Sequence, residues 1–114
     1  MTISEFTAQT GVTESTLRYY EKIGVLPAVP RDGAGKRMYS EDYFVNVRLV
    51  QGLKASGMPL AWIRDYISLS AQGERTLDAR RTILLATRQM VMKKLAVFKN
   101  AMQLLDGQLA DCSN

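Results

Sequence analysis

Apolar residues recur at helical spacing in two short runs within the first 24 residues of the chain. Thr2 and Glu5 form a capping box, which predicts a helix over residues 3–10. Thr13 is a suitable N-cap for a second helix, which Gly24 ends. The pattern therefore predicts two short amphipathic helices joined by a tight turn.

A polar segment follows and interrupts the helical pattern. Pro27 and Pro30 prevent the second helix from restarting, because proline lacks the backbone N–H and clashes with the preceding turn. Gly33 and Gly35 then lie between short polar arms. This arrangement predicts a small hairpin with a flexible tip over residues 31–39, which is too small to be stable alone.

Helical periodicity returns after the hairpin. Ser40 is an N-cap for a helix that runs to about Ser56. Pro59 suits the first turn of another helix over residues 59–70. We therefore expect residues 1–70 to form one mainly α domain.

One long helical pattern dominates the rest of the chain. No proline occurs between Arg75 and Leu109, and Gly107 is the single glycine there. The pattern predicts one helix of roughly 33 residues, about 50 Å long, within residues 75–109. Residues 110–114 are then expected to be a short C-terminal tail.

The apolar residues of this helix are spaced as in a coiled coil. They follow at alternating steps of four and three residues from Leu77, and eight of ten such positions are apolar, the exceptions being Arg81 and Arg88. We expect this seam to pair with a second copy of the chain, so that residues 75–109 form a dimerisation helix. The residues expected at the dimer interface are Leu84, Val91, Leu95, Phe98, Met102 and Leu105.

A second apolar row beside the seam makes the stripe too broad for a two-helix interface alone. It consists of Ile83, Met90, Val97 and Leu104. We expect the helix to pack against the preceding domain as well as against its partner. The alternative is a long helix that folds back on its own monomer.

Composition narrows the class of protein. The chain has 114 residues, of which 46% are hydrophobic and 23% charged, as in an ordinary single globular domain. No segment approaches the ~20 uninterrupted apolar residues of a membrane helix, and the first residues do not resemble a signal peptide. We expect a cytoplasmic protein, with no membrane partner.

The near absence of histidine and cysteine disfavours most enzymatic and metal chemistry in this chain. It has no histidine, and Cys112 is the single cysteine. A conventional zinc site cannot be assembled within one subunit, and a disulfide framework within the chain is excluded. Histidine-based acid–base chemistry is excluded too, so we expect no enzyme, no cofactor and no metal site.

The basic charge is local. The net charge is +4, and residues 15–40 hold five basic residues against two acidic ones. This surplus permits an anionic partner in that region. The basic residues of 71–114 fall between apolar positions of the long helix, where a solvated helical face explains them better.

Two short helices followed by a basic, glycine-tipped hairpin form the pattern of a winged helix-turn-helix, which binds double-stranded DNA. The second helix would enter the major groove, and the wing would contact the DNA backbone. The residues of that helix that lie off its apolar stripe and can hydrogen-bond to bases or phosphates are Ser15, Thr16, Arg18, Tyr19 and Lys22. In the wing, Lys36 and Arg37 would neutralise phosphates, and the Tyr39 hydroxyl would donate to another.

Three residues of this unit have a structural alternative. Tyr20 and Tyr39 could be core aromatics instead. Arg18 could pair with Glu14 or Glu21 on the same helix.

Three segments of the sequence resemble the MerR family of bacterial transcription regulators. They are the run from Thr16 to Pro27 with the pattern TLRYYE-x-IG-x-LP, residues 36–40, and Gly57-Met58-Pro59-Leu60 with Ile63-Arg64. The resemblance implies a winged helix-turn-helix followed by an antiparallel dimerisation coiled coil. It places Thr16, Arg18 and Tyr19 in the recognition helix and makes Arg37, Tyr39, Arg31 and Lys36 contacts of the wing.

The resemblance also implies a mechanism. A homodimer would bind a near-palindromic operator between two promoter elements that are set too far apart. An effector would let the dimer bend and untwist this DNA, so that RNA polymerase engages both elements. The alternative function is an architectural or adaptor protein that dimerises by its coiled coil and uses the winged unit for protein contacts.

The cysteine content of the chain bears on the class of effector. Metal-sensing members of the family carry cysteines at the start of the dimerisation helix, and this chain has none there. It is more similar to short members that respond to small organic compounds or aldehydes. Trp62 and Tyr66 are candidates to line an effector cleft against the partner's long helix, and Cys112 is a candidate thiol sensor.

Overall fold

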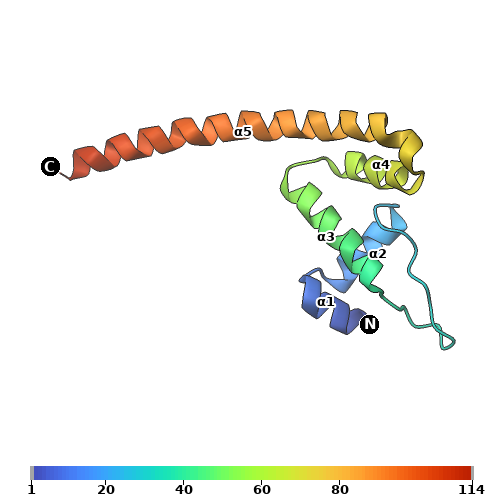
Figure 1. Cartoon of the computed structure of the whole chain (residues 1–114). Helices are drawn as coiled ribbons and strands as arrows, with labels where there is room; N and C mark the ends of the chain where they lie inside the picture. The colour runs from blue at the N-terminus through green and yellow to red at the C-terminus, as the bar shows by residue number, and fades with distance from the viewer. Residues whose placement is uncertain (1, 114) are drawn as a thin grey trace.

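The computed structural model describes residues 2–113, and within them the regular elements are helical (Figure 1). The helices are α1 (Ile3–Thr10), α2 (Glu14–Lys22), α3 (Glu41–Ala55), α4 (Leu60–Ala71), a short 3-10 turn η1 (Glu74–Thr76) and α5 (Leu77–Cys112). Helices α1–α4 gather at one end of the molecule, and α5 passes over α4 and projects far beyond them. The mainly α class and every predicted helix are confirmed.

The helix starts follow from capping residues, as the sequence predicts. Thr2 and Glu5 form the capping box of α1. The Thr13 side chain accepts a hydrogen bond from the N–H of Thr16 at 3.2 Å, and Ser40 accepts one from Tyr43 at 3.2 Å. These side chains satisfy backbone donors that a helix leaves unpaired at its first turn.

Helix α5 is longer than the sequence analysis predicts. It has 36 residues and ends at Cys112, so residues 110–112 continue the helix instead of forming a tail. The physical reason is that residues 108–112 contain no glycine or proline, which are the residues that commonly end a helix.

The predicted hairpin is a loop, closed by a single antiparallel bridge between Arg31 and Arg37. The Asp32 carboxylate accepts hydrogen bonds from the N–H groups of Ala34 at 2.9 Å and Lys36 at 3.0 Å. These bonds, with Gly35 in the left-handed conformation, form a tight tip. The arms are too short to add further ladder bonds, and we call residues 31–39 the wing loop.

The core of the domain lies between α1–α4 and is rich in aromatic residues. The Phe6 ring stacks on Tyr39 with ring centroids 4.6 Å apart, and it meets Tyr43 and Phe44 edge-on. The side chains that are almost completely buried are Phe6, Leu17, Val25, Val50 and Ile63. This cluster joins α1, α2, α3 and α4 to Val25, in the segment that leads into the wing loop.

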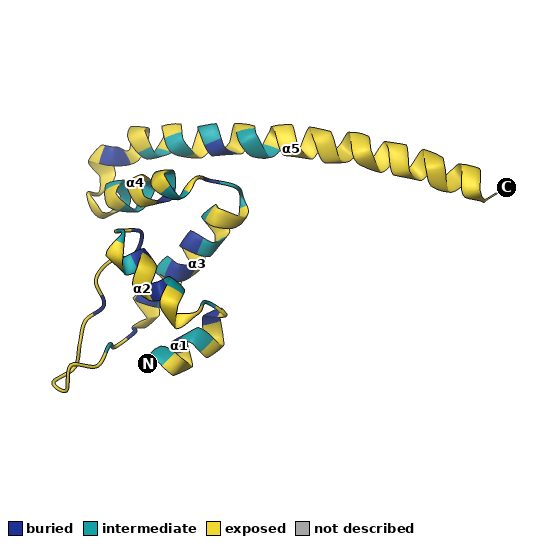
Figure 2. Ribbon diagram, turned by 180° about the vertical axis from the view of Figure 1, so that it is seen from behind, coloured by how far each residue is buried: buried dark blue, intermediate teal, exposed yellow. Residues whose placement is uncertain are grey.

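Only the first half of α5 packs against its own domain (Figure 2). Thr87 is buried, and Ile83 packs against the core. From Met92 onwards the helix is exposed on all sides, although it carries Leu95, Phe98 and other large apolar residues. The alternative of a long helix folded back on its own monomer therefore does not describe this structure. No helix within residues 2–113 combines the length and apolar character that a membrane span requires.

Candidate nucleic-acid interface

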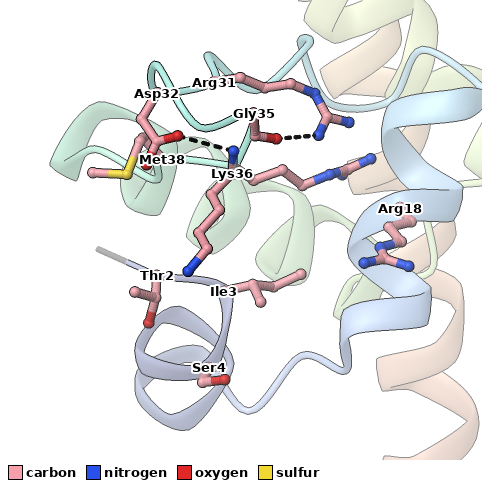
Figure 3. Close-up of a pocket in the computed structure, with 10 residues that line it drawn as sticks. Thr2, Ile3, Ser4, Arg18, Arg31, Asp32, Gly35, Lys36 and Met38 are labelled. Carbon is pink, nitrogen blue, oxygen red and sulfur yellow. Dashed lines mark hydrogen bonds between the residues drawn. The ribbon is translucent and has the colours of Figure 1, made fainter.

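A basic groove lies between α2, the wing loop and the start of α1 (Figure 3). Its volume is about 740 Å³. The charged residues that line it are Arg18, Arg31, Lys36, Arg37 and a single acid, Asp32. In Figure 3 the Lys36 side chain reaches toward Thr2, and Arg18 lies across the groove on α2. The groove thus brings together basic residues that are up to 19 positions apart, and its positive surplus suits an anionic ligand.

The outer side of α2 carries the polar residues that the sequence analysis selected. Ser15, Arg18, Tyr19 and Lys22 are exposed, whereas Thr16 is half-buried and hydrogen-bonded to Thr13 at 2.8 Å. Leu17 and Tyr20 are buried on the opposite side. The predicted division of this helix into an apolar and a polar face is confirmed.

Arg18 forms an ion pair with Glu14, one turn earlier on α2. The sequence predicts this pair as the structural alternative for Arg18. Both side chains are about half exposed, and an exposed pair of this kind contributes only about 0–1 kcal/mol. A phosphate or base edge can therefore displace Glu14 at little cost, so the pair leaves Arg18 available for an anion.

Arg37 and Tyr39 do not lie on the open surface of the wing loop. Tyr39 is 2% exposed and stacks on Phe6, which agrees with the core alternative and does not fit a contact to the DNA backbone. Arg37 pairs with Glu21 of α2, with 18% of its side chain exposed. The pKa of Arg37 is raised, chiefly by a hydrogen bond with Tyr39. Of the predicted wing contacts, Arg31 and Lys36 remain exposed.

The sequence analysis missed Lys54, which lies on a second groove beside the start of α2. This groove has a volume of about 420 Å³ and is also lined by Thr13, Thr16 and Tyr20. The Lys54 ammonium donates a hydrogen bond to the Tyr20 hydroxyl at 2.9 Å, which raises the pKa of Lys54. No local signal could have found this pair, because 34 positions separate the two residues.

The predicted effector residues lie on two different helices of the chain, α4 and α5. Trp62 and Tyr66 are half-buried on α4, and Trp62 packs against the core. A groove of about 460 Å³ between α4 and α5 is lined instead by Asp65, Ser68, Leu69, Ala79, Thr82 and Ile83. Cys112 is exposed at the end of α5. The effector cleft involves a second copy of the chain and stays a prediction.

Residues 1–69 match the family described as MerR HTH family regulatory protein. The chain is similar to the HTH-type transcriptional regulator AdhR of Bacillus subtilis, with 33% identity over 93 residues that cover 82% of this chain and 66% of AdhR. It is 32% identical over 100 residues to an uncharacterized HTH-type transcriptional regulator of Haemophilus influenzae, covering 88% of this chain and 74% of that protein. The chain thus spans just under two thirds of the length of AdhR.

Solved structures share the fold. The structure of HiNmlR, a MerR family regulator lacking the sensor domain, was determined bound to promoter DNA; it superposes with a TM-score of 0.84 and 30% identity, over 96% of this chain and 86% of that one. A regulator from Listeria monocytogenes superposes with a TM-score of 0.88 and 28% identity, over 96% of this chain and 83% of that one. Both superpositions include almost the whole of this chain, and therefore α5 as well as α1–α4.

Proposed function

Because the chain belongs to the MerR family of helix-turn-helix regulatory proteins, we propose that it binds an operator within promoter DNA as a homodimer and regulates transcription there. The observation that carries this proposal is the basic groove beside the exposed face of α2. The residues proposed to contact bases or phosphates are Ser15, Thr16, Arg18, Tyr19 and Lys22 of α2, with Arg31 and Lys36 of the wing loop. The DNA-bound structure of HiNmlR, which has the same fold, supports the choice of promoter DNA as the partner.

Helix α2 and the wing loop would make different kinds of contact with DNA. Helix α2 presents one exposed face of hydrogen-bonding side chains, which fits the base edges in a major groove. Arg31 and Lys36 lie beside it on the exposed wing loop, where they would neutralise flanking phosphates and release counterions. Phosphate contacts would fix the position of the domain, and α2 would read the sequence.

The exposed half of α5 supports the homodimer. Large apolar residues that remain in water on a long helix require a partner, and the coiled-coil spacing fits a second copy of the same helix. Two antiparallel α5 helices, each about 54 Å long at 1.5 Å per residue, would hold two α2 helices at a fixed separation. A symmetric dimer of this kind fits a near-palindromic operator.

The same geometry supports control by DNA distortion. Bending or untwisting the operator costs a few kcal/mol, and the dimer would offset this cost by contacts at both half-sites. We propose that an effector, of the small organic class, shifts the dimer toward the distorting state and lets RNA polymerase engage the promoter in the cytoplasm. Trp62 and Tyr66 of one chain, with α5 of its partner, remain the proposed effector residues.

The test is selection of host genomic fragments by the purified protein, followed by footprinting of the best fragment at several salt concentrations. We expect a near-palindrome within an overlong promoter spacer. Arg18→Ala should weaken binding to this fragment, whereas Arg75→Ala, a matched change on an exposed residue of η1, should not. Recovery of only non-specific, steeply salt-dependent binding would refute the proposal and favour the adaptor alternative.

A further inference from the structure

We propose that Glu21 and Arg37 form a strut that holds the wing loop against α2, and that Arg37 acts through this strut instead of contacting a DNA phosphate. Arg37 is then a positioning residue, although its charge and place in the wing suggest a direct contact. The inference rests on the proposed function, because the wing loop matters here as part of a DNA-binding surface.

One carboxylate connects three segments of the chain. One oxygen of Glu21, on α2, pairs with the Arg37 guanidinium of the wing loop. The other oxygen accepts a hydrogen bond from the backbone N–H of Val29 at 3.4 Å. Glu21 therefore links α2 both to the wing loop and to the segment that leads into it.

The strut is shielded from water, in contrast to the other basic contacts. The side chains of Arg37 and Glu21 are only 18% and 20% exposed, whereas those of the Arg18–Glu14 pair are about half exposed. Removing one partner of a shielded ion pair leaves the other charge poorly solvated, so it is costlier than separating an exposed pair. Arg37 is therefore held in place by Glu21 more firmly than Arg18 is held by Glu14.

The backbone of the wing loop explains why Arg37 points inward. Successive side chains of an extended segment face opposite sides. Lys36 and Met38 are exposed, whereas Arg37 is half-buried and Tyr39 is buried on Phe6 of α1. Arg37 and Tyr39 thus anchor the loop to α2 and α1, which leaves Lys36 directed outward.

The first test exploits the sign of the charge. Glu21→Gln removes a negative charge beside the DNA-binding surface, so simple electrostatics predicts tighter binding to any DNA. The strut predicts the opposite for the operator: about tenfold weaker specific binding, with non-specific binding unchanged or tighter. Equal or tighter operator binding by Glu21→Gln would overturn the strut.

The second test uses the salt dependence of operator binding. A residue that neutralises a phosphate contributes about one unit to the slope of log K against log salt. Arg37→Gln should weaken operator binding by about tenfold and leave this slope unchanged, because Arg37 is already paired. Lys36→Gln, the matched control on the neighbouring exposed residue, should reduce the slope by about one. A slope reduced by about one in Arg37→Gln would assign Arg37 to a phosphate and overturn the strut.

A charge exchange separates the strut from a direct contact most sharply. Glu21→Arg combined with Arg37→Glu restores an ion pair in the reverse orientation and leaves the net charge unaltered. The added positive charge alone would tighten binding to any DNA, so the quantity compared is the ratio of operator to non-specific binding. The strut predicts that this ratio is higher in the double variant than in Arg37→Glu alone. A direct phosphate contact predicts that the ratio does not recover, because the acidic residue then faces the DNA.

Hydrogen exchange without DNA keeps the inference independent of operator binding. In Glu21→Gln, the amide of Val29 and the amide of Met38, which donates to the Pro30 carbonyl at 2.9 Å, should exchange faster. Amides within α5 serve as the control and should not change. Unchanged exchange at Val29 and Met38 would overturn the strut even if the protein binds its operator. If the wild-type protein prefers no operator, the proposed function fails and the role assigned to Arg37 in DNA binding fails with it.

Discussion

Two glutamates in the exposed seam of α5 should convert the proposed dimer into monomers. We choose Leu95→Glu together with Phe98→Glu, because both side chains lie beyond the part of α5 that packs on its own domain. In the single chain Leu95 is 61% exposed and Phe98 is 66% exposed. The substitutions therefore remove little from the monomer and act on the interface between copies.

The expected magnitude follows from these exposed fractions. Complete burial of a leucine or phenylalanine side chain contributes about 1.5–3 kcal/mol, and each dimer would bury two of each. Since about two thirds of each side chain is available for burial on dimerisation, the double substitution should cost roughly 4–8 kcal/mol of association free energy. Even the lower figure raises the dissociation constant by about a thousandfold.

Sedimentation equilibrium across a micromolar concentration series measures this change, and circular dichroism checks that α5 stays helical. The matched control is Gln89→Glu with Asn100→Glu, which adds the same charge at exposed positions. Asn100 lies about 200° around the helix from Phe98, on the side away from the seam. The control should remain a dimer.

Two results would refute the reasoning. A Leu95→Glu/Phe98→Glu variant that stays dimeric would show that the seam is not the interface. A wild-type protein that is monomeric at micromolar concentration would remove the homodimer altogether, and with it the proposed fit to a near-palindromic operator.

Three further predictions concern the stability of the domain, measured by urea unfolding. Phe6→Ala removes the ring stacked on Tyr39 and should lower the free energy of unfolding by about 3–5 kcal/mol. A loss no larger than that of a substitution on the surface would contradict the placement of this ring in the core. Thr13→Ala removes the N-cap of α2 and should cost about 1 kcal/mol, while an unchanged midpoint would show that the cap is dispensable. Burial raises the pKa of Tyr43 above its ordinary value of 10.0, so above pH 10 the unfolded chain loses this proton more readily than the folded one and stability should fall. Tyr43→Phe should cost about 1 kcal/mol at neutral pH, because the bond to the Pro27 carbonyl is lost, and it should lessen the alkaline decline; the same decline in the variant would contradict the assignment to Tyr43.

The fold was predictable from the sequence because its signals are local. Capping side chains at Thr2, Thr13 and Ser40 lie within three residues of the N–H groups they accept from. The long apolar repeat of α5 is likewise visible without knowing what it packs against. The end of α5 was harder to predict, because no glycine or proline after Gly107 marks where the helix stops.

The interface was predictable only in part, because its decisive contacts are not local. Arg18 has its partner one turn away, and the sequence analysis considered that pair. Glu21 and Arg37 are 16 positions apart, and Lys54 and Tyr20 are 34 positions apart. Charge and spacing identify candidates in such cases, but the partner that each candidate finds depends on how the domain packs.

One local signal distinguishes the inward-pointing from the outward-pointing side chains of the wing loop. In an extended arm that leads into the core, alternate side chains must point inward. Tyr39 is aromatic and precedes the N-cap Ser40, so a core position for Tyr39 implies an inward Arg37 and an outward Lys36. The same rule makes the carboxylate of Glu21 necessary, because an arginine that points inward needs a partner for its charge. Alternate residues of the short wing loop thus differ in place: Arg37 and Tyr39 anchor the loop to the helices, whereas Lys36 and Met38 are exposed, and Lys36 is the one proposed to contact a DNA phosphate.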